Sequence, residues 1–191
     1  MNIIVAVDNN WGIGYNNKLL QIIPEDMRLF KQLTYNKIVI MGRETFESLP
    51  NKQPLKNRIN IVLSRDKEFI ENNSNTNNQL IIYQSLDELF ARLKNVIYYN
   101  SDKIFIIGGE SIYKQFLPYC DKAYITKINR EYKADRYFVN LDESEGWKLV
   151  FEGENRYFDV NGSENVNDFI EYRFLQYKNN NNIERSKVCK T

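Results

Sequence analysis

The chain has 191 residues, 26 Lys and Arg against 25 Asp and Glu, a net charge of +1, and no histidine. Without histidine, Ser-His-Asp and Cys-His triads and His-containing zinc sites are excluded, so proton transfer must use Asp, Glu, Tyr, Lys or water. The even charge balance predicts no general attraction to nucleic acid or to an anionic membrane, and no apolar run approaches the ~20 residues of a membrane span.

The cysteine content and the N-terminus indicate a cytoplasmic protein. Cys120 and Cys189 are too few for a disulfide framework. The first apolar run, residues 3–7, has no basic segment before it and is typical of a strand rather than of a signal peptide. We therefore expect a reducing, cytosol-like compartment.

Short apolar runs rich in Ile and Val recur along the chain and are typical of strands buried on both faces of a parallel sheet. They span residues 3–7, 38–41, 59–63, 80–83, 104–107 and 124–128. Near the C-terminus, Ile170, Tyr172 and Phe174 alternate with polar residues, which predicts an antiparallel pair at that edge. The fold class is therefore α/β, a single domain with a mixed, mainly parallel sheet.

Two segments between these runs have helical spacing. Pro24 can occupy the first position of a helix, and Asp26, Leu29, Phe30 and Leu33 follow at i, i+3, i+4 and i+7. A second helix is predicted from Leu86, Leu89, Phe90 and Leu93, which follow the capping-box pair Ser85 and Glu88.

Two polar segments are expected to lie outside the folded core. Residues 72–79 are almost entirely Asn, Ser and Thr and predict a surface loop, and residues 178–191 predict an Asn-rich, disordered tail. The domain is therefore expected to cover residues 1–177.

Asp26 stands at the head of an apolar helical stripe, and two interpretations remain open. The acid can simply complement the helix dipole in the first turn. Alternatively, it can lie in an apolar cleft, where desolvation raises the pKa of a carboxyl group and makes it a proton donor or acceptor. Glu25 is expected to face solvent and to serve as its control.

Glycines follow several of the predicted strands and suggest an anion site. Gly12-Ile13-Gly14 lacks the third glycine of a dinucleotide fingerprint, and the chain has no Walker A sequence. Gly108-Gly109 lies between a strand and a helical segment, and Met41-Gly42-Arg43 and Ser64-Arg65 also follow strands. In open α/β sheets, ligands bind at the carboxyl ends of strands, so these sites together predict a phosphate-binding edge.

In their order and spacing these motifs resemble the dihydrofolate reductase family across about residues 3–177. The shared motifs are Ile13-Gly14, Ile23-Pro24-Glu25-Asp26 with Phe30-Lys31 and Thr34, Val39-Ile40-Met41-Gly42-Arg43-x-Thr45, Leu55-x-x-Arg58-x-Asn60, Ser64-Arg65, Ile107-Gly108-Gly109 with Tyr113, and Tyr124-Ile125-Thr126. The resemblance implies a central eight-stranded sheet and reduction of 7,8-dihydrofolate to 5,6,7,8-tetrahydrofolate by NADPH, with no metal and in a monomer.

The resemblance also assigns roles to individual residues. Asp26 would bind the pterin and promote protonation at N5 through water, with hydride going to C6, and Thr126 would bond Asp26 and the pterin amino group through water. The remaining substrate contacts would be Ile4, Val5, Phe30 and Ile107 around the pterin and Arg58 on the glutamate carboxylate. The cofactor contacts would be Ala6, Ile13, Gly42, Arg43, Thr45, Ser64, Arg65, Gly108, Gly109, Ser111 and Tyr113, with Ser64 and Arg65 at the 2′-phosphate and a cis peptide at Gly108-Gly109.

The chain departs from the family pattern at Gln21, where the family usually has a Trp that packs near the substrate and orders a water. We expect altered substrate affinity or loop closure rather than lost chemistry. Two alternatives remain open: a riboflavin-pathway reductase, which shares this fold class and NADPH, and a non-catalytic nucleotide- or pterin-binding module.

Overall fold

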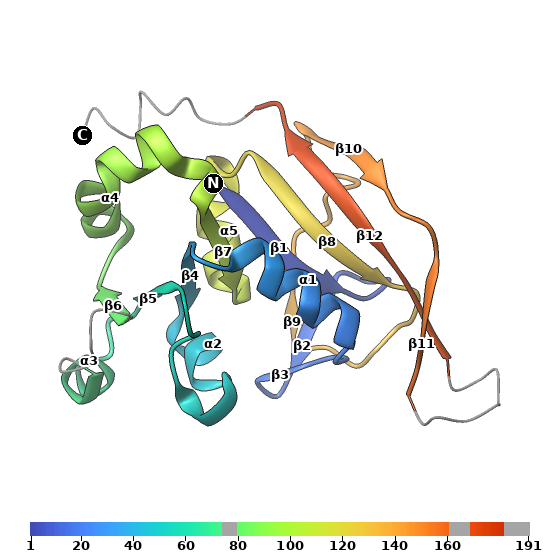
Figure 1. Cartoon of the computed structure of the whole chain (residues 1–191), viewed down its shortest axis with the longest axis horizontal. Coiled ribbons are helices and arrows are strands. Elements are labelled where there is room, and N and C mark those ends of the chain that lie inside the picture. Colours follow the sequence, from blue (N-terminus) through green and yellow to red (C-terminus); the bar gives the residue numbers. More distant parts are fainter. Residues whose placement is uncertain (74–79, 161–168, 182–191) are drawn as a thin grey trace.

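The computed structural model describes residues 1–73, 80–160 and 169–181 (Figure 1). Its helices are α1 (Pro24–Thr34), α2 (Arg43–Glu47), α3 (Lys67–Asn73), α4 (Leu86–Asn100) and α5 (Glu110–Phe116). Its strands are β1 (Asn2–Val7), β2 (Gly12–Tyr15), β3 (Lys18–Leu19), β4 (Ile38–Gly42), β5 (Ile59–Leu63), β6 (Leu80–Tyr83), β7 (Ile104–Gly108), β8 (Lys122–Ile128), β9 (Arg136–Tyr137), β10 (Trp147–Glu152), β11 (Arg156–Asp159) and β12 (Phe169–Asn179).

The central sheet confirms the expected α/β class. Its order is β10-β12-β8-β1-β7-β4-β5-β6, an eight-strand path, and β11 pairs with β12 as a ninth strand. The strands from β8 through β1 to β6 are parallel, whereas β12 is antiparallel to β8, β10 and β11. The antiparallel edge predicted from the alternation at residues 170–174 is therefore present.

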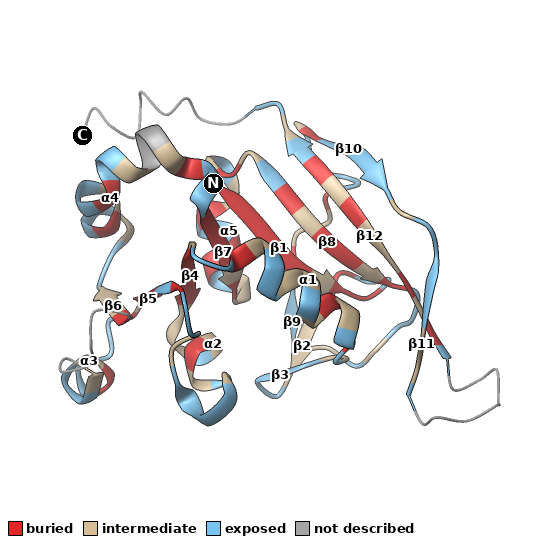
Figure 2. Ribbon diagram, in the orientation of Figure 1, coloured by how far each residue is buried: buried red, intermediate tan, exposed pale blue. Residues whose placement is uncertain are grey.

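Helices cover both faces of the sheet, and each face has its own apolar core. On one face α4 and α5 place Leu89, Leu93 and Phe116 against alternate residues of the central strands. On the other face α1, α2 and α3 pack over Ile4, Val39 and Met41. Figure 2 shows the buried positions concentrated in the central strands, as expected of a sheet covered on both sides.

The two helices predicted from spacing form as expected. Helix α1 begins at Pro24 and carries Glu25 and Asp26 in its first turn. Helix α4 begins after Ser85, whose hydroxyl accepts a hydrogen bond from the Glu88 amide at 3.1 Å. In the described part of the chain, no helix is long and apolar enough to span a membrane.

The boundaries of the two polar segments differ from expectation. Asn72 and Asn73 belong to α3, and the Asn73 side chain donates to the Phe69 carbonyl. Strand β12 continues to Asn179, because Lys178 pairs with Lys122 and Lys148, and Asn179 pairs with Trp147. Pairing across the sheet thus extends the last strand beyond residue 177. The rest of these segments, 74–79 and 182–191, lies outside the described residues.

Candidate active site

The strand order creates a crevice at the carboxyl ends of β1 and β7. The ladder between these strands comprises Asn2↔Phe105 and Ile3↔Ile106, whereas the ladder between β1 and β8 continues to Val7↔Lys127. The strands therefore diverge beyond Ile3, between parallel neighbours that lie far apart in sequence. Such a switch point in an open α/β sheet is where ligands bind.

Asp26 and Thr126 meet beside this crevice. The Thr126 hydroxyl donates to Asp26 Oδ1 at 2.5 Å, although the residues are 100 positions apart, and both side chains are buried. Burial raises the pKa of Asp26 above its ordinary value, and the Thr126 hydrogen bond opposes this because it stabilises the carboxylate. Of the two interpretations of Asp26, the structure favours the acid in an apolar setting.

The apolar residues expected around the pterin do not all share one face. Ile4 belongs to the core on the α1 face, and Phe30 and Ile107 pack against that core. Val5 instead belongs to the core on the α4 and α5 face. Its side chain therefore points away from Asp26, and only its backbone is available to a ligand in the crevice.

The predicted cis peptide joins Gly108 and Gly109 at the end of β7. Gly108 has φ +120°, a conformation that side-chain-bearing residues rarely adopt, and a Cβ at Gly109 would lie 3.3 Å from Thr45 Oγ1. The glycines thus keep the backbone open to a ligand. Nearby, Tyr113 donates from its hydroxyl to the Ile4 carbonyl at 2.8 Å, so its polar end lies toward the crevice.

Arg58 is held in position before β5. Its Nε donates to Thr34 Oγ1 at 2.8 Å and its Nη1 donates to the Lys56 carbonyl at 2.9 Å. The guanidinium carbon lies 5.7 Å from the centre of the Phe30 ring, and burial lowers the pKa of the guanidinium. These contacts orient a planar donor beside Phe30, which suits a carboxylate ligand.

The glycine-containing edge is also assembled as predicted. Strands β7, β4 and β5 are adjacent and parallel, so Gly42, Ser64 and Gly108 end side by side. Ser64 is buried, and the neighbouring Arg65 is exposed. Ser111 is exposed in α5, which follows Gly109 directly. This edge has backbone, hydroxyl and cationic groups that fit the phosphates of a dinucleotide.

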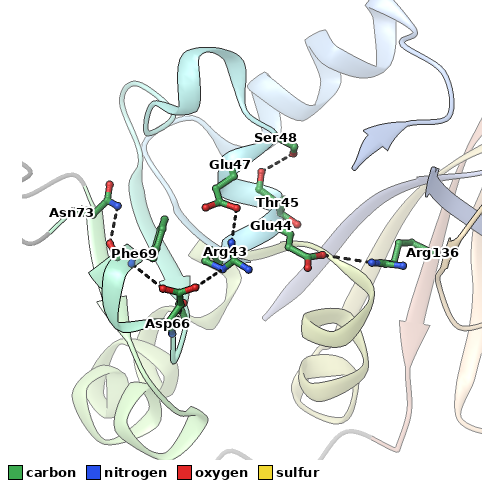
Figure 3. A network of polar contacts seen from close by, with 10 residues as sticks. Arg43, Glu44, Thr45, Glu47, Ser48, Asp66, Phe69, Asn73 and Arg136 are labelled. Carbon is green, nitrogen blue, oxygen red and sulfur yellow. Dashed lines mark hydrogen bonds and ion pairs between the residues drawn. The ribbon is translucent and has the colours of Figure 1, made fainter. Parts of the chain in front are cut away.

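Arg43 is not simply available to a phosphate. Its Nη1 donates to Glu47 Oε2 at 2.7 Å, and its Nε lies 3.6 Å from Asp66 Oδ2 (Figure 3). A phosphate at Arg43 would have to compete with these carboxylates or bind alongside them. The exposed Arg65 is therefore the less encumbered cation at this edge.

The segment after β1 is fixed by two acids that sequence reasoning missed. Buried Asp8 accepts from the amides of Gly12 and Tyr132 at 2.7 and 2.9 Å. Asp135 Oδ2 accepts from the Asn16 amide at 3.1 Å, and its own amide donates to the Gly14 carbonyl. An acid directly after a buried strand was the available signal for Asp8, whereas Asp135 had none.

Three residues expected around the nicotinamide or the pterin lie on the same side of the molecule. Ala6 is opposite Thr126 in the ladder between β1 and β8, and half-buried Ile13 is in β2. Gln21 precedes α1 and donates to the Ile22 carbonyl at 3.2 Å. The amide of Gln21 is thus satisfied locally.

Glu25 differs from expectation, because it is not a solvent-facing control. It accepts a hydrogen bond from the Tyr172 hydroxyl at 2.5 Å and forms an ion pair with Arg156. Its side chain is 34% exposed. Periodicity along α1 could not reveal partners supplied by β11 and β12.

A cavity of about 240 Å³ lies under α1, toward the C-terminal strands. Its wall is mostly apolar and consists of Ile4, Leu29, Leu33, Tyr124, Ile125, Thr126, Phe151, Phe174, Leu175 and Gln176. Of the residues expected to bind substrate, only Ile4 and Thr126 line it. It is therefore distinct from the crevice beside Phe30 and Ile107. Among the described residues, no group of three or more Cys, Asp or Glu is arranged to hold a metal ion.

The divergent parallel strands, the buried acid and the glycine-containing edge define the class of the protein: an α/β enzyme with a cofactor crevice. Comparison with known proteins identifies the family. The dihydrofolate reductase family model matches residues 1–178. The chain belongs to the dihydrofolate reductase family and is an oxidoreductase, and the family uses a nicotinamide cofactor.

Individual relatives agree with the family match. The chain is 34% identical over 183 residues to the dihydrofolate reductase of Bacillus subtilis (strain 168), covering 95% of each protein. It is 37% identical over 155 residues to that of Buchnera aphidicola subsp. Acyrthosiphon pisum (strain APS), covering 81% of this chain and 88% of that protein. It is 34% identical over 154 residues to dihydrofolate reductase type 9 of Escherichia coli, covering 80% of this chain and 82% of that protein. These matches favour this family over the riboflavin-pathway alternative.

Proposed function

We propose that this enzyme reduces 7,8-dihydrofolate to 5,6,7,8-tetrahydrofolate with NADPH. The reaction consumes dihydrofolate, NADPH and one proton, and it yields tetrahydrofolate and NADP⁺. NADPH supplies the hydride that adds to C6 of the pterin. The observation that carries the proposal is the buried Asp26–Thr126 pair beside the crevice between β1 and β7.

Asp26 promotes the addition of the proton to N5. A buried carboxyl with a raised pKa binds a proton more readily at neutral pH than an exposed one. It accepts hydrogen bonds from the pterin amino group and N3, and its charge favours delivery of the proton to N5 through water. Thr126 keeps the carboxylate at this position through its hydrogen bond. The reaction therefore needs neither histidine nor metal.

Other residues bind and orient the reactants. Phe30, Ile4 and Ile107 enclose the ring and exclude water, and the Ile4 and Ile107 carbonyls face the pterin. The Ile4 carbonyl accepts from Tyr113 and keeps one further lone pair for the ligand. Arg58, held by Thr34 and Lys56, binds the glutamate carboxylate through paired hydrogen bonds.

The residues at the carboxyl ends of β1, β4, β5 and β7 fit the cofactor. Ala6 and Ile13 would hold the nicotinamide end. Gly42, Thr45, Gly108, Gly109, Ser111 and Tyr113, with Arg43 shared between a phosphate and its carboxylate partners, would surround the phosphates and neighbouring groups. Ser64 and Arg65 would bind the 2′-phosphate and so select NADPH over NADH.

We further propose that the chain acts as a monomer in the cytoplasm, with residues 1–177 as the core of its catalytic domain. Every residue assigned to the site lies in this one chain. The buried thiol of Cys120 suits a reducing compartment.

The test is to follow NADPH absorbance with purified protein, with and without dihydrofolate. We expect a decrease that depends on dihydrofolate and is largely lost in Asp26→Asn. A decrease that requires a pyrimidine ribosyl substrate instead would indicate the riboflavin-pathway activity. No oxidation with either substrate would indicate a binding module and overturn the proposal.

A further inference from the structure

The first turn of α1 is attached to the sheet through two consecutive carboxylates. Asp26 accepts from Thr126 on β8, and Glu25 Oε2 accepts from the Tyr172 hydroxyl on β12 at 2.5 Å. Strands β8 and β12 are antiparallel neighbours, with Phe174 opposite Thr126 in their ladder. The two carboxylates therefore bind adjacent strands, and the place of one constrains the other (Figure 1).

The partners of Glu25 are themselves fixed. Tyr172 is 3% exposed, and its ring meets the Phe174 ring edge to face at 5.7 Å. Arg156 bonds the other oxygen of Glu25, and its guanidinium carbon lies 5.3 Å from the centre of the Phe174 ring. Burial and the hydrogen bond to Glu25 raise the pKa of Tyr172 to about 12, so the phenol remains a donor at neutral pH. Glu25 thus contacts an ordered cluster rather than a loose surface cation.

Other contacts constrain this part of the helix incompletely. Ile23 packs with Ile128 and Tyr172 and so anchors the residue before the helix, but it caps no helical amide with its side chain. Farther along α1, the cavity separates Leu29 and Leu33 from Phe174 and Gln176. Atoms that line a void lack dispersion partners on that side. Apolar packing therefore leaves the rotation of the first turn about the helix axis weakly determined.

We propose that Glu25, together with Tyr172 and Arg156, is a positioning group that fixes the rotation of the first turn of α1 and thereby holds the Asp26 carboxylate against Thr126. This inference rests on the role of Asp26 in the proposed function. Glu25 itself touches neither substrate nor cofactor. Small displacements of a reacting group can cost ~10²-fold in rate, so such an anchor affects turnover.

Tyr172→Phe is the principal test, because it removes one hydroxyl and keeps the charge of Glu25. We expect a longer, weaker bond between Thr126 and Asp26, which raises the pKa of Asp26, since that bond stabilises the carboxylate. The pH profile of kcat should move to higher pH, and kcat at neutral pH should fall about tenfold, less than the loss expected from removing Asp26. The affinity for NADPH should stay unchanged.

Two further variants separate position from charge. Glu25→Gln keeps an oxygen that can accept from Tyr172 but loses the ion pair with Arg156, so it should have a smaller effect than Tyr172→Phe. Glu152→Ala is the matched control, because Glu152 pairs with Arg173 at 2.9 Å between β10 and β12 and does not contact α1 through that pair. It should leave kcat and the pH profile unchanged.

The titration of the Asp26 carboxyl carbon, followed by NMR in the protein without ligands, makes the inference independent of turnover. A higher midpoint in Tyr172→Phe, with no change in Glu152→Ala, supports the positioning role even if wild-type protein fails to reduce dihydrofolate. An unchanged midpoint in folded Tyr172→Phe overturns it, and so does an equal shift in the control. If wild type turns over dihydrofolate but neither variant changes titration or kcat, only the positioning inference fails.

Discussion

Replacing Asp26 with Asn separates the chemistry of this residue from its place in the fold. The two side chains have nearly the same shape, and the Asn oxygen can still accept the bond that Thr126 donates over 2.5 Å. Only the ionisable group is lost. We expect turnover at neutral pH to fall by at least ~10²-fold, as is typical for losing a general acid or base. That corresponds to ~2.7 kcal/mol in the barrier. Activity should partly recover in acid, where solvent supplies the proton.

The same substitution should change stability in the opposite direction. Burial raises the pKa of Asp26 in the folded protein above the unfolded value of 3.8. Between these two pKa values the folded state binds more protons than the unfolded state, so the stability contribution falls as pH rises through this window. Above the folded pKa the cost of burying the charge is complete. Asp26→Asn removes this cost, so the variant should be more stable than wild type at neutral pH, and the difference should vanish below the unfolded pKa.

Two measurements on the same preparations test this reasoning. Steady-state rates of NADPH oxidation across pH give the loss and its recovery in acid, and denaturant melts at neutral and acidic pH give the stability difference. Wild-type turnover in the Asn variant at neutral pH would refute the catalytic role. Lost activity accompanied by lower stability at neutral pH would instead show that Asp26 acts mainly through the structure.

Three other substitutions probe the remaining parts of the site. Arg58→Lys should raise the KM for dihydrofolate about tenfold or more at nearly unchanged kcat, because one ammonium cannot replace paired charge-assisted bonds worth ~1.5–3 kcal/mol; an unchanged KM would contradict this role. Arg65→Ala should raise the KM for NADPH about tenfold or more and leave that for NADH nearly unchanged, since only NADPH carries the 2′-phosphate; equal changes for both cofactors would place Arg65 elsewhere. Gln21→Trp should alter the KM for dihydrofolate or the rate of loop closure measured by stopped flow, because an aromatic ring adds apolar area beside the substrate; identical kinetics would show that the position is indifferent.

Features that depend on neighbours within a few residues followed from the sequence. The Ile- and Val-rich runs gave the parallel strands, Pro24 began α1, and the Ser85–Glu88 pair began α4. Local periodicity and caps are determined by side chains about one turn or one pleat apart, so a single sequence contains them. The absence of histidine likewise directed attention to a carboxylate, and its place at the head of an apolar stripe singled out Asp26.

Contacts between distant segments were decided by the tertiary structure. Thr126 reaches Asp26 across 100 positions, and Tyr172 reaches Glu25 across 147, because the strand order brings β8 and β12 beneath α1. The same order points Val5 away from Asp26, pairs Arg43 with Glu47 and Asp66, and extends β12 to Asn179. The family motifs indicated which residues belong to the site. Which face each side chain occupies, and which charges are already paired, depend on register and packing, and these arise only when the whole sheet is assembled.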